Sequence, residues 1–85
     1  MNEKDFLDIL TKCIRRISKD AYIDIDIQDR REDIPSWTSL NHMIIIAELE
    51  NELGLSFSLQ EAIDSSIGVS AIIGVLKEKV DSKIS

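Results

Sequence analysis

The sequence predicts an all-α fold, a single four-helix bundle with a long loop between helices 1 and 2 and a short third helix. Three observations support this prediction. Apolar residues recur at helical spacing in three long segments, at about residues 3–18, 39–53 and 69–81. A Ser-x-x-Glu capping box opens a shorter segment, at residues 59–64. The chain has 85 residues, enough for one hydrophobic core and too few for two, so we expect one domain over residues 1–85.

The first helix can be capped by Asn2, whose side chain can accept from the free N–H groups of the first turn. Its apolar face consists of Phe6, Ile9, Leu10, Cys13, Ile14 and Ile17. Residues 20–33 form the long loop, in which Ile23, Ile25 and Ile27 alternate with polar residues. Alternation is typical of a strand, but a single strand has no partner here. We therefore expect an extended loop that packs its isoleucines under the bundle.

The second helix follows Pro35, which cannot lie inside a helix, and Ser36 or Thr38 can provide its N-cap. Gly54 ends it in the usual C-cap role. One buried face is predicted from Ile45, Ile46, Leu49 and Leu53. The helix has a second apolar row, headed by Ser39 and continued by Met43 and Ala47. Either the domain surrounds this helix on several sides, or the second row contacts a partner.

The third and the last helix are predicted from fewer sequence signals. Ser58 and Glu61 form the capping box of the third helix, whose Ala62 and Ile63 can reach the core. The last helix begins after Gly68 and ends at about Asp81, beyond which we expect the chain to fray. Its buried face consists of Val69, Ile72, Ile73, Leu76 and Val80.

Composition excludes several classes of protein. Ten basic and sixteen acidic residues give a net charge of −6, and residues 34–76 contain five acids and no Lys or Arg. This distribution of charge leaves no basic surface for binding nucleic acid in that part of the chain, and it favours protein partners with basic patches. No apolar run can span a bilayer, no secretory signal is recognisable, and the single cysteine cannot form an internal disulfide. A calcium-binding loop of the EF-hand type is excluded for the segment that begins at Asp24, because its sixth and twelfth positions, which require Gly and Glu, hold Asp29 and Pro35. We expect a cytoplasmic monomer without a metal.

The segment Pro-Ser-Trp-Thr-Ser-Leu, followed after six residues by Ala-Glu-Leu-Glu-Asn-Glu-Leu-Gly, resembles the acyl carrier protein family over nearly the whole chain. The resemblance implies the acyl-carrier type of bundle. In that family the serine of an Asp-Ser-Leu motif carries 4′-phosphopantetheine, whose thiol binds acyl groups as thioesters. The matching residue is Ser39, followed by Leu40, and Thr38 stands where the family usually has Asp. Ile44 also departs from the family, which often has an acid there.

The resemblance implies a carrier without catalytic activity of its own, in a specialised biosynthetic pathway. It would be recognised by a phosphopantetheinyl transferase and by acyl-loading or acyl-transferring enzymes. The implied recognition residues are Thr38, Leu40, Met43, Ile44, Ala47 and Glu48. An aminoacyl or peptidyl carrier for non-ribosomal synthesis, and a degenerate carrier fold that docks proteins without the arm, remain alternatives.

Two other side chains near Ser39 could take part in chemistry. Trp37 is more often a packing residue than a ligand contact at such a position. His42 could act as a base toward Ser39 in a hydrolase, but no glycine-rich turn is present to form an oxyanion hole. We therefore predict that Trp37 packs and that His42 lies on the surface.

Overall fold

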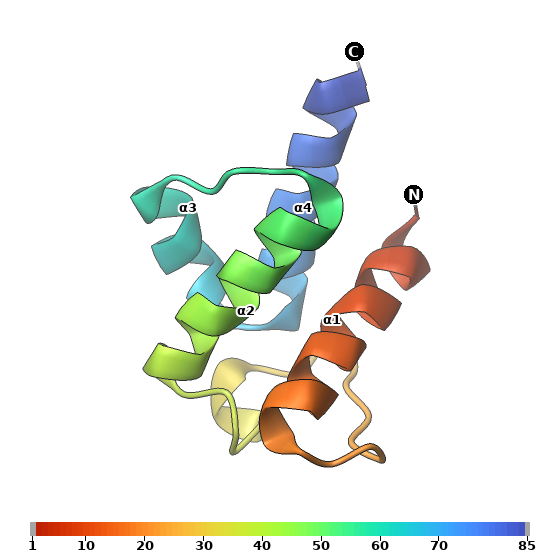
Figure 1. Cartoon of the computed structure of the whole chain (residues 1–85), viewed down its shortest axis with the longest axis vertical. Helices are drawn as coiled ribbons and strands as arrows, with labels where there is room; N and C mark the ends of the chain where they lie inside the picture. Colours follow the sequence, from red (N-terminus) through yellow and green to blue (C-terminus); the bar gives the residue numbers. More distant parts are fainter. Residues whose placement is uncertain (1, 85) are drawn as a thin grey trace.

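The computed structural model describes residues 2–84, except for the side chain of Ile84. Within this range lie four α-helices: α1 (Glu3–Ser18), α2 (Ser39–Leu53), α3 (Leu59–Asp64) and α4 (Val69–Ile84). Two 3-10 turns, η1 (Arg31–Asp33) and η2 (Ser65–Ile67), lie in the connections. Helix α1 packs against both α2 and α4, and α3 packs against α4 through η2 (Figure 1). The predicted all-α four-helix fold is confirmed.

The helix ends follow local sequence signals. Asn2 and Asp5 form a capping box at the start of α1, each backbone N–H donating to the other's side chain at 3.0 Å. Thr38, rather than Ser36, caps α2 by accepting from the N–H of Asn41 at 3.1 Å. Gly54 ends α2 with a φ of 65°, in the left-handed region that glycine adopts without steric cost. The predicted capping residues at these three ends are correct.

Helix α4 is longer than predicted, since it continues to Ile84 rather than ending at about Asp81. The predicted end of this helix at about Asp81 is therefore wrong. A contact from the last turn explains the difference: Nζ of Lys83 donates to the carbonyls of Gly54 at 3.1 Å and Leu53 at 3.4 Å. These carbonyls belong to the end of α2, so the last turn of α4 is tied to a segment about thirty residues earlier.

The hydrophobic core lies between the helices and contains residues from each of them and from the loop. Its buried apolar members are Phe6, Leu10, Cys13, Ile14, Ile34, Trp37, Ile45, Ile46, Leu49, Ala62, Val69, Ile72, Ile73 and Leu76. The predicted faces of α1, α2 and α4 supply most of them, and Leu53 and Val80 pack at the edge. Ile63 does not join the core as predicted, because 54% of it is exposed.

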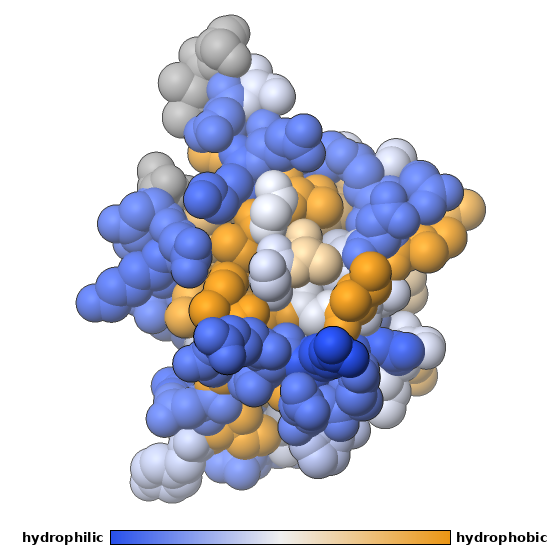
Figure 2. Space-filling view, turned by 180° about the vertical axis from the view of Figure 1, so that it is seen from behind, coloured by the Kyte–Doolittle hydropathy of each residue, from blue (hydrophilic) through white to orange (hydrophobic). Residues whose placement is uncertain are grey.

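The long loop packs its isoleucines against the core as predicted, with Ile23, Ile25 and Ile27 partly buried. It forms no strand, but its end is fixed to the start of α4. Arg30 pairs with Gly68 in an isolated antiparallel bridge, and the N–H of Val69 donates to the carbonyl of Asp29 at 3.0 Å. Seen from the side of α4, the molecule carries many hydrophilic side chains with apolar ones exposed between them (Figure 2).

Candidate functional site

Ser39 is the first residue of α2 and is exposed to solvent. The loop positions it through two buried side chains on its N-terminal side, Ile34 and Trp37. Thr38 provides the N-cap, so the Ser39 side chain itself is not needed for capping. The positive end of the helix dipole lies at this turn and favours a negatively charged substituent on the hydroxyl.

A second residue at the site, Arg31, comes from η1. Its Nη1 donates to Oγ of Ser39 at 3.1 Å. Arg31 cannot be recognised from the sequence as part of this site, because eight residues separate it from Ser39 and only the folded loop brings them together. The one available signal was the Arg30-Arg31 pair, the last cations before a long stretch without Lys or Arg.

A shallow groove of about 260 Å³ begins beside Ser39 and runs between α2 and α3. Its lining comes from η1, α2, α3 and η2, and consists of Arg31, Ser39, His42, Met43, Ala62, Ile63 and Ser66. The apolar side chains of Met43 and Ile63 are half-exposed in it. A flexible group attached to Ser39 could therefore lie against an apolar surface without opening the core.

The second apolar row of α2 faces solvent together with Leu40 and Ile44 beside it. Leu40 is 74% exposed, Met43 51% and Ile44 42%, and Ala47 is also exposed. These four residues follow the i, i+3, i+4, i+7 spacing of one helix face. Thr38, also exposed, stands at the head of this face. The alternative in which the domain surrounds α2 on several sides is therefore wrong.

Glu48, the last of the predicted recognition residues, does not join this exposed face. It turns toward α1, where Oε1 pairs with Nη1 of Arg16 at 3.1 Å. Its other carboxylate oxygen is buried and has no hydrogen-bond partner among the described residues. Cys13 lies buried nearby, as predicted, and burial together with the Glu48 carboxylate raises the pKa of its thiol to about 12. This thiol is therefore protonated and unreactive at neutral pH.

The prediction that His42 lies on the surface is wrong, since it is only 3% exposed. Nε1 of Trp37 donates to Nδ1 of His42 at 3.0 Å, and Nε2 of His42 lies 2.8 Å from the carbonyl of Ala62. Because the indole can only donate, Nδ1 accepts, and the proton of the neutral ring is on Nε2. Burial lowers the pKa of His42, and the nearby Arg31 charge lowers it further.

His42 therefore joins three segments: the loop through Trp37, α2 through its own backbone, and α3 through Ala62. Both ring nitrogens are engaged, so neither is free to accept a proton from Ser39. The packing role predicted for Trp37 is confirmed by its 3% exposure and its stacking against the His42 ring. These contacts exclude the arrangement that a hydrolase base would require.

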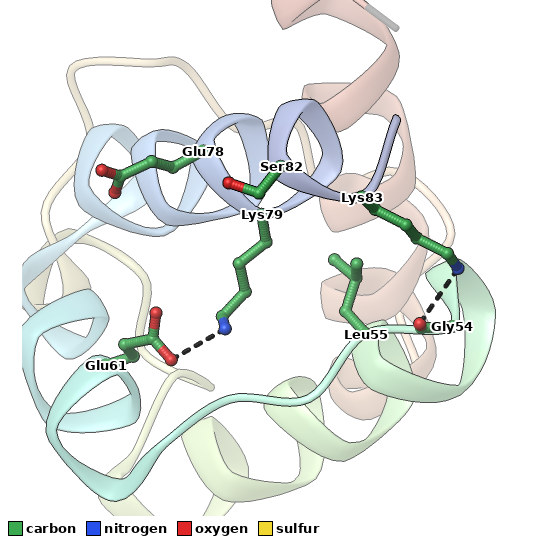
Figure 3. A pocket seen from close by; sticks show the side chains of 7 residues that line it. All are labelled: Gly54, Leu55, Glu61, Glu78, Lys79, Ser82 and Lys83. Atoms are coloured by element: carbon green, nitrogen blue, oxygen red, sulfur yellow. Dashed lines mark hydrogen bonds and ion pairs between the residues drawn. The ribbon is translucent and has the colours of Figure 1, made fainter. Parts of the chain in front are cut away.

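A wider hollow of about 620 Å³ lies at the opposite end of α2, between α4 and the segment after Gly54 (Figure 3). Lys79 spans it to pair with Glu61 of α3 at 2.8 Å, and Lys83 reaches the carbonyl of Gly54. The Lys79 ammonium and the capping contact with Ser58 lower the pKa of the Glu61 carboxyl. The cations here are engaged in holding helices together, which makes this hollow a structural feature.

Comparison of the chain with protein-family models, with curated proteins and with solved structures gives no match in any of the three. Among residues 2–84, no helix has the length and apolarity that crossing a bilayer requires. The same residues contain no group of three or more His, Cys, Asp or Glu side chains arranged to hold a metal ion. The candidate site rests on the exposed Ser39 hydroxyl, its contact with Arg31 and the groove between α2 and α3.

Proposed function

We propose that the chain is a carrier of acyl groups, which are bound as thioesters to a 4′-phosphopantetheine arm on Ser39. The observation that carries this proposal is the exposed Ser39 hydroxyl in the first turn of α2, beside a cation and at the end of an apolar groove. A buried hydroxyl could not enter the active site of a modifying enzyme. An unfolded segment would not present it in a fixed orientation.

The proposed modification uses coenzyme A as the donor. The Ser39 oxygen attacks the phosphorus that bears pantetheine, a new O–P bond forms, and the bond to the adenosine bisphosphate leaving group breaks. The hydroxyl proton passes to a base of the phosphopantetheinyl transferase. The arm then ends in a thiol that exchanges acyl groups with loading and transferring enzymes, so the chain itself catalyses no reaction and remains a cytoplasmic carrier.

The exposed face of α2 is the proposed contact surface for these enzymes. Leu40, Met43, Ile44 and Ala47 form its apolar part, with Thr38 at the head. Glu48 contributes less than expected, because Arg16 already neutralises it.

The test is incubation with a broad-specificity phosphopantetheinyl transferase and coenzyme A, followed by intact mass. We expect one pantetheinyl adduct on the wild-type chain and none on Ser39→Ala. Ser70→Ala is the matched control, because Ser70 is also an exposed serine in the first turn of a long helix, α4, and its loss should leave the adduct unchanged. An adduct on Ser39→Ala would move the site elsewhere.

A wild-type chain that stays unmodified would favour the second candidate, a docking module without the arm. The exposed apolar face of α2 and the uncharged N-cap at Thr38 are the observations that support this candidate. An aminoacyl or peptidyl carrier would take up the same arm, and the identity of the enzyme that loads the thiol would distinguish it from an acyl carrier.

A further inference from the structure

Arg31 carries a positive charge to the Ser39 hydroxyl without a carboxylate to balance it. Nη1 of Arg31 lies 3.1 Å from Oγ of Ser39. The ion pairs formed by Arg15, Arg16, Arg30 and Lys79 join other cations to carboxylates, and none of these pairs involves Arg31. A guanidinium has five N–H donors, and a neutral hydroxyl accepts only weakly from it. The charge is therefore available to an anion at this position.

The position of Arg31 is fixed by the fold of the loop. The N–H of Ile34 donates to the carbonyl of Arg31 at 3.2 Å, and the N–H of Trp37 donates to the carbonyl of Ile34 at 2.9 Å. Ile34 and Trp37 are both buried in the core. Two successive turns with buried anchors thus determine where η1 stands relative to the start of α2.

We propose that Arg31 is the positioning residue for the phosphodiester that joins the arm to Ser39. This inference rests on the proposed function. The phosphorus would be bonded to the same Oγ that Arg31 contacts, so the phosphate oxygens would lie one bond beyond the present acceptor. A guanidinium pairs with two phosphate oxygens at once and forms stronger hydrogen bonds with an anion than with a hydroxyl.

Thr38 supports the same pairing, because it is uncharged where the resemblance implies an acid. Its hydroxyl accepts from the N–H of Asn41 and offers Arg31 no competing carboxylate. Arg31 also lines the groove between α2 and α3. A phosphate held by Arg31 would fix the attached end of the arm at the end of this groove, and this would restrict the directions in which the arm can extend.

The test compares the modified wild-type chain with modified Arg31→Gln, Arg31→Lys and Arg30→Gln. Arg30→Gln is the matched control, since it removes the same charge one residue away, where the guanidinium faces Glu32 at 3.9 Å. The readouts are the ³¹P resonance of the attached phosphate and the ¹⁵N resonance of the Arg31 guanidinium, with backbone amide spectra as the check on folding.

In the wild type we expect the Arg31 guanidinium resonance to shift on modification. We expect the ³¹P resonance to move as salt is raised to about 1 M, where the screening length is about 3 Å. Arg31→Gln should lose the salt-dependent ³¹P shift, Arg31→Lys should retain part of it, and Arg30→Gln should retain all of it.

Modified chains whose ³¹P resonances are the same in wild type and Arg31→Gln would overturn the inference and leave the carrier function intact. A salt-independent wild-type resonance would do the same without relying on any variant. A wild-type chain that takes up no arm would overturn both, so failure of the inference and failure of the proposed function give different results.

Discussion

Replacing His42 with leucine would leave the indole N–H of Trp37 without its acceptor in the core. The two residues are each 3% exposed and their hydrogen bond is 3.0 Å long. A buried donor without a partner costs about 1–3 kcal/mol, and leucine has a side chain of comparable size, so the cavity contribution is small. The carbonyl of Ala62 keeps an acceptor role, because the hydroxyl of Ser65 donates to it at 3.0 Å. We therefore expect a loss of about 2 kcal/mol in the free energy of unfolding.

The assay is a double-mutant cycle measured by urea denaturation and circular dichroism. Trp37→Phe removes the donor and leaves the His42 acceptor unpaired, whereas the double variant Trp37→Phe/His42→Leu removes both partners together. The double variant should be less destabilised than the sum of the single variants, with a coupling free energy of about 1–2 kcal/mol. Single-variant effects that add to within about 0.5 kcal/mol would refute the reasoning, because additivity means that the two side chains do not interact.

Four further predictions concern individual residues. The pKa of His42 is lower in the folded than in the unfolded chain, so the unfolded state binds the proton first as pH falls. The free energy of unfolding, measured by urea titrations at several pH values, should therefore fall as pH drops below 6.5. His42→Leu should abolish the part of this pH dependence that comes from His42. Gly68→Ala should destabilise by about 1–3 kcal/mol, because its Cβ would lie 2.8 Å from the carbonyl of Asp29. Gly74→Ala, with open space around the new Cβ, should instead stabilise the chain by about 0.5–1 kcal/mol. Thermal melts of both variants are the measurement, and equal changes in stability for Gly68→Ala and Gly74→Ala would contradict this account. The Cys13 thiol should react with a maleimide only after denaturation, and rapid labelling of the native chain would contradict its burial.

Local signals in the sequence predicted most of the fold. The start and end of α2 depend on Pro35, Thr38 and Gly54, which act over a few residues and can be recognised without the tertiary structure. The exposed row on α2 is one of two alternatives that the sequence predicts, because periodicity shows that a helix has two apolar faces and does not show which one is covered.

The errors arose where tertiary contacts decide the outcome. His42 stands three and four residues before Ile45 and Ile46, so it continues the buried face of α2, yet its polarity suggested the surface. Burial is possible because Trp37 and Ala62 satisfy both ring nitrogens, and neither partner could be identified from sequence spacing. The proximity of Arg31 to Ser39 likewise depends on turns in the loop, which propensity alone does not predict.

The bridge between Arg30 and Gly68 divides the long loop into two parts with different tolerance for change. After Asp29 the backbone is bonded to α4 and leads directly to Ser39, so an added residue there would displace the hydroxyl. Before Asp29 the loop turns through Tyr22, which is 91% exposed. An epitope or fluorescent reporter inserted between Ala21 and Tyr22 would therefore be accommodated with Ser39 left in place, which would allow the protein to be followed in modification and binding assays.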